Sequence, residues 1–149
     1  KTERIKMGNR AVIAFTKEGK KDKNNVGIYL HWNGGRDSVE GFLQAAKDYE
    51  LRSDSYGVAR LVQIISNFFP GTLSVGVGVI KSLDCDNYDN GVYWVDQNFN
   101  IVDREFFGFK KEQEIYLLDE FVDEVKKRND FVFGKDPYKK LKKMQGGAA

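Results

Sequence analysis

The segment His31-Trp32-Asn33-Gly34-Gly35-Arg36-Asp37-Ser38 decides the fold of this chain, because a strand is expected before it and a helix after it. Apolar residues alternate over 26–32, as in a strand with one buried face. Apolar residues then recur at helical spacing from Val39 to Ala46. Asp37 and Glu40 are predicted to start this helix as a capping box. The two glycines allow a sharp turn between strand and helix.

The same patterns predict the remaining elements. Further strands are expected at 10–15, 72–80, 92–95 and 101–107, and further helices from Asp54 to Phe69 and over an apolar stripe at Ile115, Leu118, Val122 and Val125. The resulting order is strand-strand-helix-helix-strand-strand-strand-helix. It indicates an α+β fold in a single domain at 1–134, with a mostly antiparallel sheet of about five strands. Residues 135–149 are expected to form a basic tail that ends in small residues.

Composition restricts the class of protein. The chain has 149 residues, enough for one domain with a core, and its single cysteine, Cys85, cannot form an internal disulfide. Apolar runs are shorter than the roughly 18 residues that a membrane helix needs. The charged N-terminal residues lack the apolar region of a signal peptide. We therefore expect a cytoplasmic protein without a membrane partner.

Charge is unevenly distributed. The chain carries a net charge of +2, whereas residues 126–144 alone carry +6, so the rest is acidic at −4. A basic region can contact nucleic acid through its phosphates. The same charges also fit a solvated helix face followed by a soluble tail, which is the reading that we favour. Direct nucleic-acid binding is therefore weakly supported.

The opening segment contains the main candidate binding site. A strand end followed by glycines and a helix start lets backbone N–H groups converge on an anion. Side chains that could stack on or hydrogen-bond a base are Tyr29, His31 and Trp32, and those that could hold phosphate are Asn33, Gly34, Gly35 and Arg36. A cap carboxylate at Asp37 would repel such an anion. The alternative is a structural corner, with Trp32 in the core and His31 hydrogen-bonded nearby.

An acidic stretch with aspartates at Asp84, Asp86 and Asp89 is the second candidate. A calcium loop of the EF-hand type needs an oxygen ligand at its fifth position and a glutamate at its twelfth. Tyr88 and Val95 occupy those positions here, so we predict no metal site. An acidic loop between strands, which could contact a basic partner protein, fits the pattern better.

Catalytic motifs are weak. His31 is the only histidine and so the only imidazole that could act as a base. Cys85 lies between two aspartates, which disfavour the reactive thiolate. Gly76-Val77-Gly78 lies within a predicted strand and precedes no helix, unlike a dinucleotide-binding fingerprint. We expect a protein that is not an enzyme and needs no cofactor, with a nucleotide-degrading enzyme as the weaker alternative.

Two stretches carry a resemblance to a known group of proteins. Gly8 to Ile13 and Ile28 to Val39 resemble small accessory proteins encoded by bacterial phages and prophages, and His31-Trp32-Asn33-Gly34-Gly35 is the specific part. Such proteins often antagonise host defences, as anti-CRISPR proteins or as sponges for nucleotide immune signals. The resemblance therefore implies a protein that binds and sequesters a small phosphate-bearing nucleotide signal.

The alternative function is inhibition of a host nuclease or CRISPR effector through protein contacts. The acidic loop at Asp84, Asp86 and Asp89 or the basic C-terminal region would then form the contact surface. Self-association is a further expectation, because the edges of the predicted hairpins and the aromatic residues Phe106, Phe107 and Phe109 could form an interface between copies.

Overall fold

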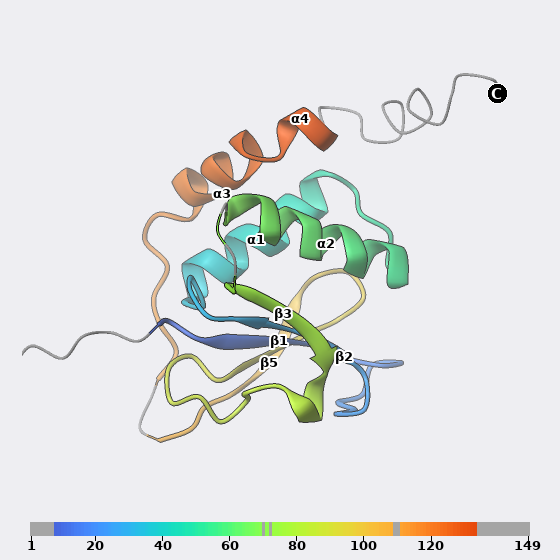
Figure 1. Ribbon diagram of the computed structural model, residues 1–149, viewed down its shortest axis with the longest axis vertical. Helices are drawn as coiled ribbons and strands as arrows, with labels where there is room; N and C mark the ends of the chain where they lie inside the picture. The colour runs from blue at the N-terminus through green and yellow to red at the C-terminus, as the bar shows by residue number, and fades with distance from the viewer. Residues whose placement is uncertain (1–7, 70, 72, 109–110, 134–149) are drawn as a thin grey trace, which may run out of the picture.

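The computed structural model describes residues 8–69, 71, 73–108 and 111–133. These residues form two layers, with the helices on one face of a five-stranded sheet (Figure 1). The elements are β1 (Ala11–Phe15), β2 (Val26–Leu30), α1 (Arg36–Asp48), α2 (Ser55–Phe68), β3 (Val75–Val79), η1 (Ile80–Ser82), β4 (Val92–Val95), β5 (Ile101–Glu105), α3 (Leu118–Lys127) and α4 (Asp130–Phe133). The predicted single-domain α+β fold, with two helices after the second strand and a helical C-terminal part, is confirmed.

The sheet has the strand order β3-β2-β1-β4-β5. Neighbouring strands are antiparallel except β1 and β4, which are parallel, so the mostly antiparallel prediction is confirmed. Every residue of β1 and of β4 is buried. Both strands are continuous apolar runs because each is covered on its two faces. The parallel pair therefore forms the centre of the sheet.

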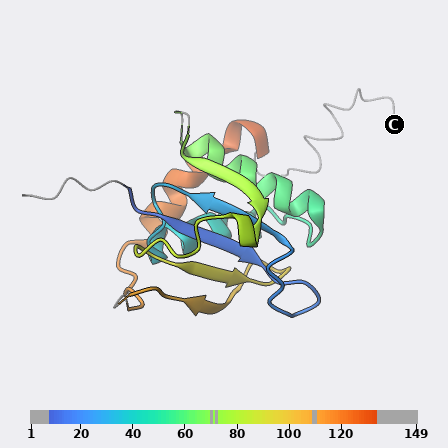
Figure 2. The same ribbon diagram turned by 60° about the horizontal axis from the view of Figure 1, so that its bottom comes forward.

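Apolar side chains fill both sides of this centre. On the helix side, Ile13 and Tyr93 pack with Phe42 of α1 and Ile65 of α2. On the opposite side, the loop after η1 crosses the sheet (Figure 2) and packs Leu83 and Cys85 against buried residues of β1 and β4. The chain therefore covers one face with helices and the other with a loop.

β2 is shorter than the sequence pattern predicts. It ends at Leu30 rather than at Trp32. His31 still donates its N–H to the Ser74 carbonyl at 2.9 Å, while its own carbonyl accepts from Asn9 N–H at 2.8 Å. These bonds bind the end of β2 to segments on either side of it. Beyond His31 the backbone leaves the sheet, so the alternation of 26–32 does not extend to Trp32.

Gly34 makes the closest backbone approach in this corner. Its N–H donates to the Asn9 carbonyl at 2.8 Å, and a Cβ at this position would lie 2.5 Å from that oxygen and 2.7 Å from the Ala11 Cβ. The Tyr93 hydroxyl donates to the Gly34 carbonyl at 2.7 Å. Asn33, at φ +55°, turns the backbone toward this position. The chain thus passes from β2 over the start of β1 and reaches β4.

The predicted capping box of α1 is wrong. The helix begins at Arg36, its N-cap residue is Gly35, and no side chain of that residue caps it. The Asp37 carboxylate accepts from the N–H of the next residue, and the Glu40 carboxylate binds Arg36 instead of closing the box. Gln113 Oε1 accepts the Arg36 N–H at 3.0 Å. A side chain from a distant segment therefore takes over part of the capping role.

Predictions for the other helices were partly correct, and β3 (Val75–Val79) is shorter than the predicted strand at 72–80. Asp54 caps α2 by accepting the Tyr56 N–H, as the sequence predicts. Ile115, however, is exposed and precedes α3, in which Val122 and Val125 form the buried stripe. Ile115 therefore belongs to the loop before α3 and not to the buried face of the helix. The predicted tail at 135–149 lies outside the described residues.

Gly34→Ala is expected to lower the free energy of unfolding by about 1–3 kcal/mol, because the added methyl group would overlap backbone atoms of Asn9 and Arg10 and the Cβ of Ala11. Gly71→Ala is the matched control, since an added Cβ there meets nothing within 4 Å. Urea denaturation followed by circular dichroism measures both. Equal unfolding midpoints for the two variants would contradict the close crossing at Gly34.

Candidate functional site

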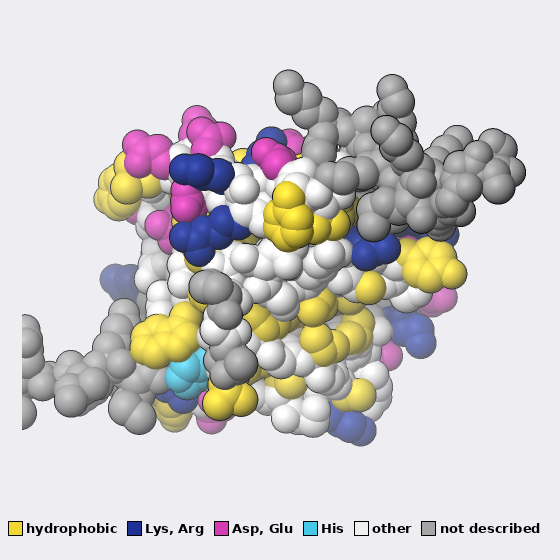
Figure 3. All heavy atoms as spheres, turned by 45° about the horizontal axis from the view of Figure 1, so that its top comes forward, with side chains coloured by type: hydrophobic (Ala, Val, Ile, Leu, Met, Phe, Trp, Pro, Cys, Tyr) yellow, Lys and Arg dark blue, Asp and Glu magenta, His cyan; other side chains and the backbone are white. Residues whose placement is uncertain are grey.

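The structure brings together the three predicted base-binding side chains. The Tyr29 hydroxyl and His31 Nδ1 are 2.8 Å apart, and the His31 and Trp32 rings meet edge to face with centroids 5.3 Å apart. Trp32 is 41% exposed, so the alternative that placed it in the core is wrong. Figure 3 shows the histidine, in cyan, at the surface beside hydrophobic side chains. Tyr29, His31 and Trp32 thus form one surface cluster.

Two of the backbone N–H groups predicted to hold phosphate are bonded within the chain itself. Gly34 N–H is bonded to Asn9, and Arg36 N–H is bonded to Gln113. The Asn33 side-chain amide donates to Ser38 Oγ at 3.3 Å. Of the four predicted phosphate-binding residues, Arg36 alone contributes a charged side chain. The corner itself therefore serves mainly to turn the chain into α1.

Arg36 belongs to a different cluster, which includes a second arginine. Its guanidinium contacts Glu40 at 3.1 Å and also contacts one carboxylate oxygen of Glu112. The other oxygen of Glu112 contacts the guanidinium of Arg104, in β5. One carboxylate thus bridges two guanidinium groups. We call Arg36 and Arg104 the arginine pair.

Arg104 is held rigidly. Its side chain is only 11% exposed, and its guanidinium lies 3.5 Å from the centre of the Tyr93 ring and 4.4 Å from that of Phe106. It donates to the backbone carbonyls of Val92 at 3.1 Å and Asn90 at 2.6 Å. Burial lowers the pKa of Arg104 to about 10, so the side chain stays charged at neutral pH. The same burial raises the pKa of the Tyr93 hydroxyl.

The arginine pair lines an open surface hollow of about 460 Å³. Its lining residues are Arg36, Ile101, Val102, Asp103, Arg104, Phe106 and Glu112. Two guanidinium groups can bind a phosphate or carboxylate, and an aromatic ring can contact a flat group. This hollow is therefore suited to an anionic ligand that carries a ring.

Sequence reasoning identified Arg36, named Phe106 only for an interface between copies, and missed Arg104 and Glu112. Arg104 pairs across the sheet with Tyr93, which is buried on the helix side. An arginine at a strand position that faces a core is unusual, because burying its charge requires a partner. The core-facing strand position of Arg104 was therefore the feature of the sequence that could have identified it. No local pattern connects Glu112 to it.

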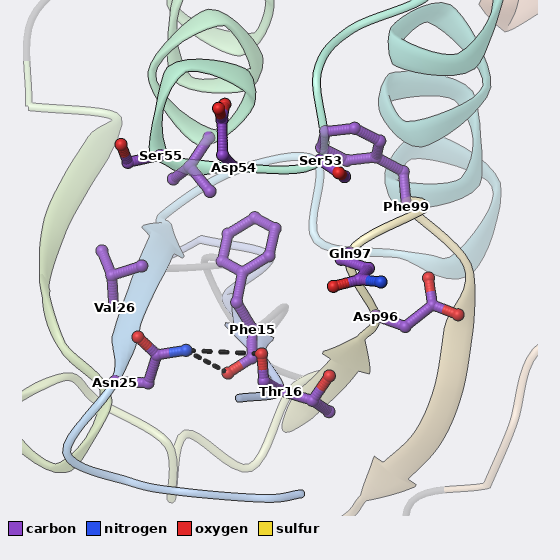
Figure 4. A pocket seen from close by; sticks show the side chains of 11 residues that line it. Phe15, Thr16, Asn25, Val26, Ser53, Asp54, Ser55, Asp96, Gln97 and Phe99 are labelled. Atoms are coloured by element: carbon purple, nitrogen blue, oxygen red, sulfur yellow. Dashed lines mark hydrogen bonds between the residues drawn. The ribbon is translucent and has the colours of Figure 1, made fainter. Parts of the chain in front are cut away.

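A second, smaller hollow of about 190 Å³ lies where β1 and β4 end beside the start of α2 (Figure 4). Its lining includes the carboxylates of Asp54 and Asp96 together with hydroxyl and amide groups, and no lysine or arginine. Asp54 caps α2, and Asp96 accepts two backbone N–H groups of the following turn. Two carboxylates disfavour a phosphate, although this hollow is more enclosed than that of the arginine pair. The anion chemistry therefore belongs to the arginine pair.

The acidic loop folds onto Arg10. The guanidinium of Arg10 contacts Asp89 at 2.7 Å and Asp84 at 3.3 Å, while Asp86 is exposed. The buried Asn87 side chain donates to backbone carbonyls of the loop and accepts its N–H groups. Among the described residues there is no group of three or more potential metal ligands. The loop thus has an internal structural role, in which the single charge of Arg10 compensates part of the charge of its three aspartates.

Cys85 is a weak candidate nucleophile in the structure as well. Its Sγ lies 3.5 Å from the Ile80 carbonyl oxygen and packs against the core on the loop side of the sheet. Burial raises the pKa of the thiol. The reactive thiolate is therefore disfavoured at neutral pH.

Comparison with known proteins finds no matching family model, no matching curated protein and no matching solved structure. Within the described part of the chain, no helix has the length and apolar character needed to span a membrane. The arginine pair is therefore interpreted from its own chemistry.

Arg104→Gln is expected to lower the free energy of unfolding by about 2–3 kcal/mol, because it removes bonds to two backbone carbonyls and stacking on two rings. Arg36→Gln is expected to cost under about 1 kcal/mol, since its ion pairs are more exposed. Urea denaturation measures both variants. Equal losses would show that Arg104 is not the structural anchor of the pair.

Proposed function

We propose that the protein binds and sequesters a small phosphate-bearing ligand of the nucleotide class at the arginine pair. The phosphate would replace the Glu112 carboxylate between Arg36 and Arg104, and the base would contact Phe106. The observation that carries this proposal is the convergence of two guanidinium groups, from α1 and β5, on one carboxylate at the wall of a hollow.

Electrostatics support an anion at this position. Two guanidinium groups repel each other unless a negative charge lies between them. Glu112 supplies one carboxylate, and its side chain is 36% exposed. A phosphate offers more acceptor oxygens than a carboxylate and fits the donor geometry of two arginines. Glu112 therefore occupies the place that a ligand phosphate would take.

Size and shape are compatible with a nucleotide. The hollow, at about 460 Å³, is within the usual range for small-molecule sites. Phe106 provides a flat apolar surface beside the arginine pair. The arginines require only an anion, whereas the nucleotide class follows from the resemblance of residues 28–39 to phage accessory proteins. Arg36 keeps its predicted role, and Tyr29, His31 and Trp32 have none in this site.

Sequestration is favoured over catalysis and over inhibition of a partner protein. The titratable side chains that line the hollow are the arginine pair, Asp103 and Glu112, which offer no pairing of a nucleophile with a base. The competing proposal, an inhibitor that acts through the acidic loop, is less favoured because Asp84 and Asp89 bind Arg10.

Glu112→Gln is expected to bind the phosphate-bearing ligand about tenfold more tightly than the wild type, because the competing charge is removed. Arg36→Gln is expected to weaken binding by a similar factor or more. Titration calorimetry with cyclic dinucleotides, ADP-ribose, AMP and inorganic phosphate measures the affinities. Glu114→Gln, which changes a nearby exposed glutamate outside the hollow, is the matched control and should bind as the wild type does.

Absence of binding of every probe to both the wild type and Glu112→Gln would contradict the proposal. Equal affinities for the wild type, Glu112→Gln and Arg36→Gln would also contradict it, since the ligand would then bind elsewhere.

The bound ligand is expected to be recovered unchanged when the protein is denatured. Mass spectrometry of the released nucleotide measures this, and a thermal shift confirms saturation, because ligand at 100 times its Kd adds about 2.7 kcal/mol to the stability. Recovery of a cleaved nucleotide would instead identify an enzyme.

A further inference from the structure

The outer edge of β3 is open. β3 is the terminal strand of the sheet, and among the described residues no strand pairs with it on the side away from β2 (Figure 1). Its sequence, Val75-Gly76-Val77-Gly78-Val79, is uncharged. An uncharged edge strand presents unpaired N–H and C=O groups that can pair with another strand.

Hydrogen bonds at the ends of the β2–β3 ladder show which groups point outward. Ile80 N–H donates to the Asn25 carbonyl, and His31 N–H donates to the Ser74 carbonyl. Alternate residues of an antiparallel strand bond to the same neighbour, so even-numbered residues of β3 bond to β2. The N–H and C=O groups of Val75 and Val77 and the N–H of Val79 therefore face the open edge, whereas the Val79 carbonyl already accepts from the Ser82 hydroxyl at 2.7 Å.

The sequence of β3 reads identically in both directions. In an antiparallel pairing of two copies centred on Val77, Val75 lies opposite Val79, Gly76 lies opposite Gly78, and Val77 lies opposite itself. The outward-facing residues of one copy then meet those of the other, which allows about four N–H···O bonds without displacing Ser82 from the two Val79 carbonyls. The strand is thus self-complementary in both side chains and backbone.

Side-chain exposure supports the same pairing. Val77 is 54% exposed and Val79 is 40% exposed, although both lie on the helix side of the sheet. A second copy of β3 would place valine beside valine and cover this apolar surface. The other edge strand, β5, carries Asp103, Arg104 and Glu105. Charged residues on an edge oppose strand addition, so the contrast favours β3 as the interface.

We propose that two copies of this protein pair through β3, antiparallel and centred on Val77, to form one continuous sheet with all helices on the same face. β5 and the arginine pair lie at the opposite edge of each sheet. The dimer therefore leaves the hollow at the arginine pair open in each of the two copies. Pairing does not depend on ligand binding, and either proposal can fail without the other.

Val77→Lys is expected to convert the dimer into a monomer, because it places two ammonium groups opposite each other at the symmetry axis. The half-exposed position lets the lysine chain reach water, so the fold is retained. Val102→Lys is the matched control, since Val102 is also 54% exposed but lies in β5. Sedimentation equilibrium over a concentration series gives the mass, and circular dichroism verifies the fold.

Mixing Val77→Lys with Val77→Glu is expected to restore a dimer, since opposite charges then meet at the axis. The full chain is used throughout. A monomeric wild type at every concentration would overturn the proposal, as would a dimer that persists in Val77→Lys. A dimer lost in Val102→Lys but not in Val77→Lys would place the interface at β5 instead.

Discussion

Gly34 passes the start of β1 so closely that no side chain would fit at this position. The Tyr93 hydroxyl of β4 donates a hydrogen bond to the Gly34 carbonyl. These contacts position the beginning of α1 above the middle of the sheet rather than above its edge. Arg36, the first residue of α1, is thereby directed toward β4 and β5. The arginine pair exists because this crossing brings two segments together that are far apart in the sequence.

Arg104 connects the fold to the site. Its guanidinium lies over the rings of Tyr93 and Phe106 and donates to the backbone carbonyls of Asn90 and Val92 at the start of β4. Those contacts compensate for removing most of the charged group from water. The remaining side of the guanidinium contacts only the carboxylate of Glu112 among these groups. Arg104 therefore both anchors the fold and has a guanidinium that can bind an anion.

Elements with a strong local signal were predictable from the sequence. The apolar runs of β1 and β4 and the Asp54 cap of α2 depend on neighbours in the chain, and the structure contains them. The capping box at Asp37 failed because Arg36 binds Glu40 and Gln113 accepts its N–H. Propensity alone could not reveal such competition from a distant segment.

The candidate site was predictable to a smaller extent for the same reason. Arg36 stood out beside a helix start, but its partners Arg104 and Glu112 come from β5 and the loop before α3. Only the pairing of β4 with β5 and the crossing at Gly34 bring them together. Tyr29, His31 and Trp32 are neighbours in sequence and do cluster, yet they lie apart from the arginine pair.

The central claim is that Arg36 and Arg104 bind an anion in place of Glu112, and NMR of the arginine Nε–H groups tests it most directly. Both signals are expected to shift together and to saturate as a phosphate-bearing nucleotide is added, while the signal of Arg10, which is paired with Asp89, stays in place. Unchanged Arg36 and Arg104 signals at saturating nucleotide would contradict the account.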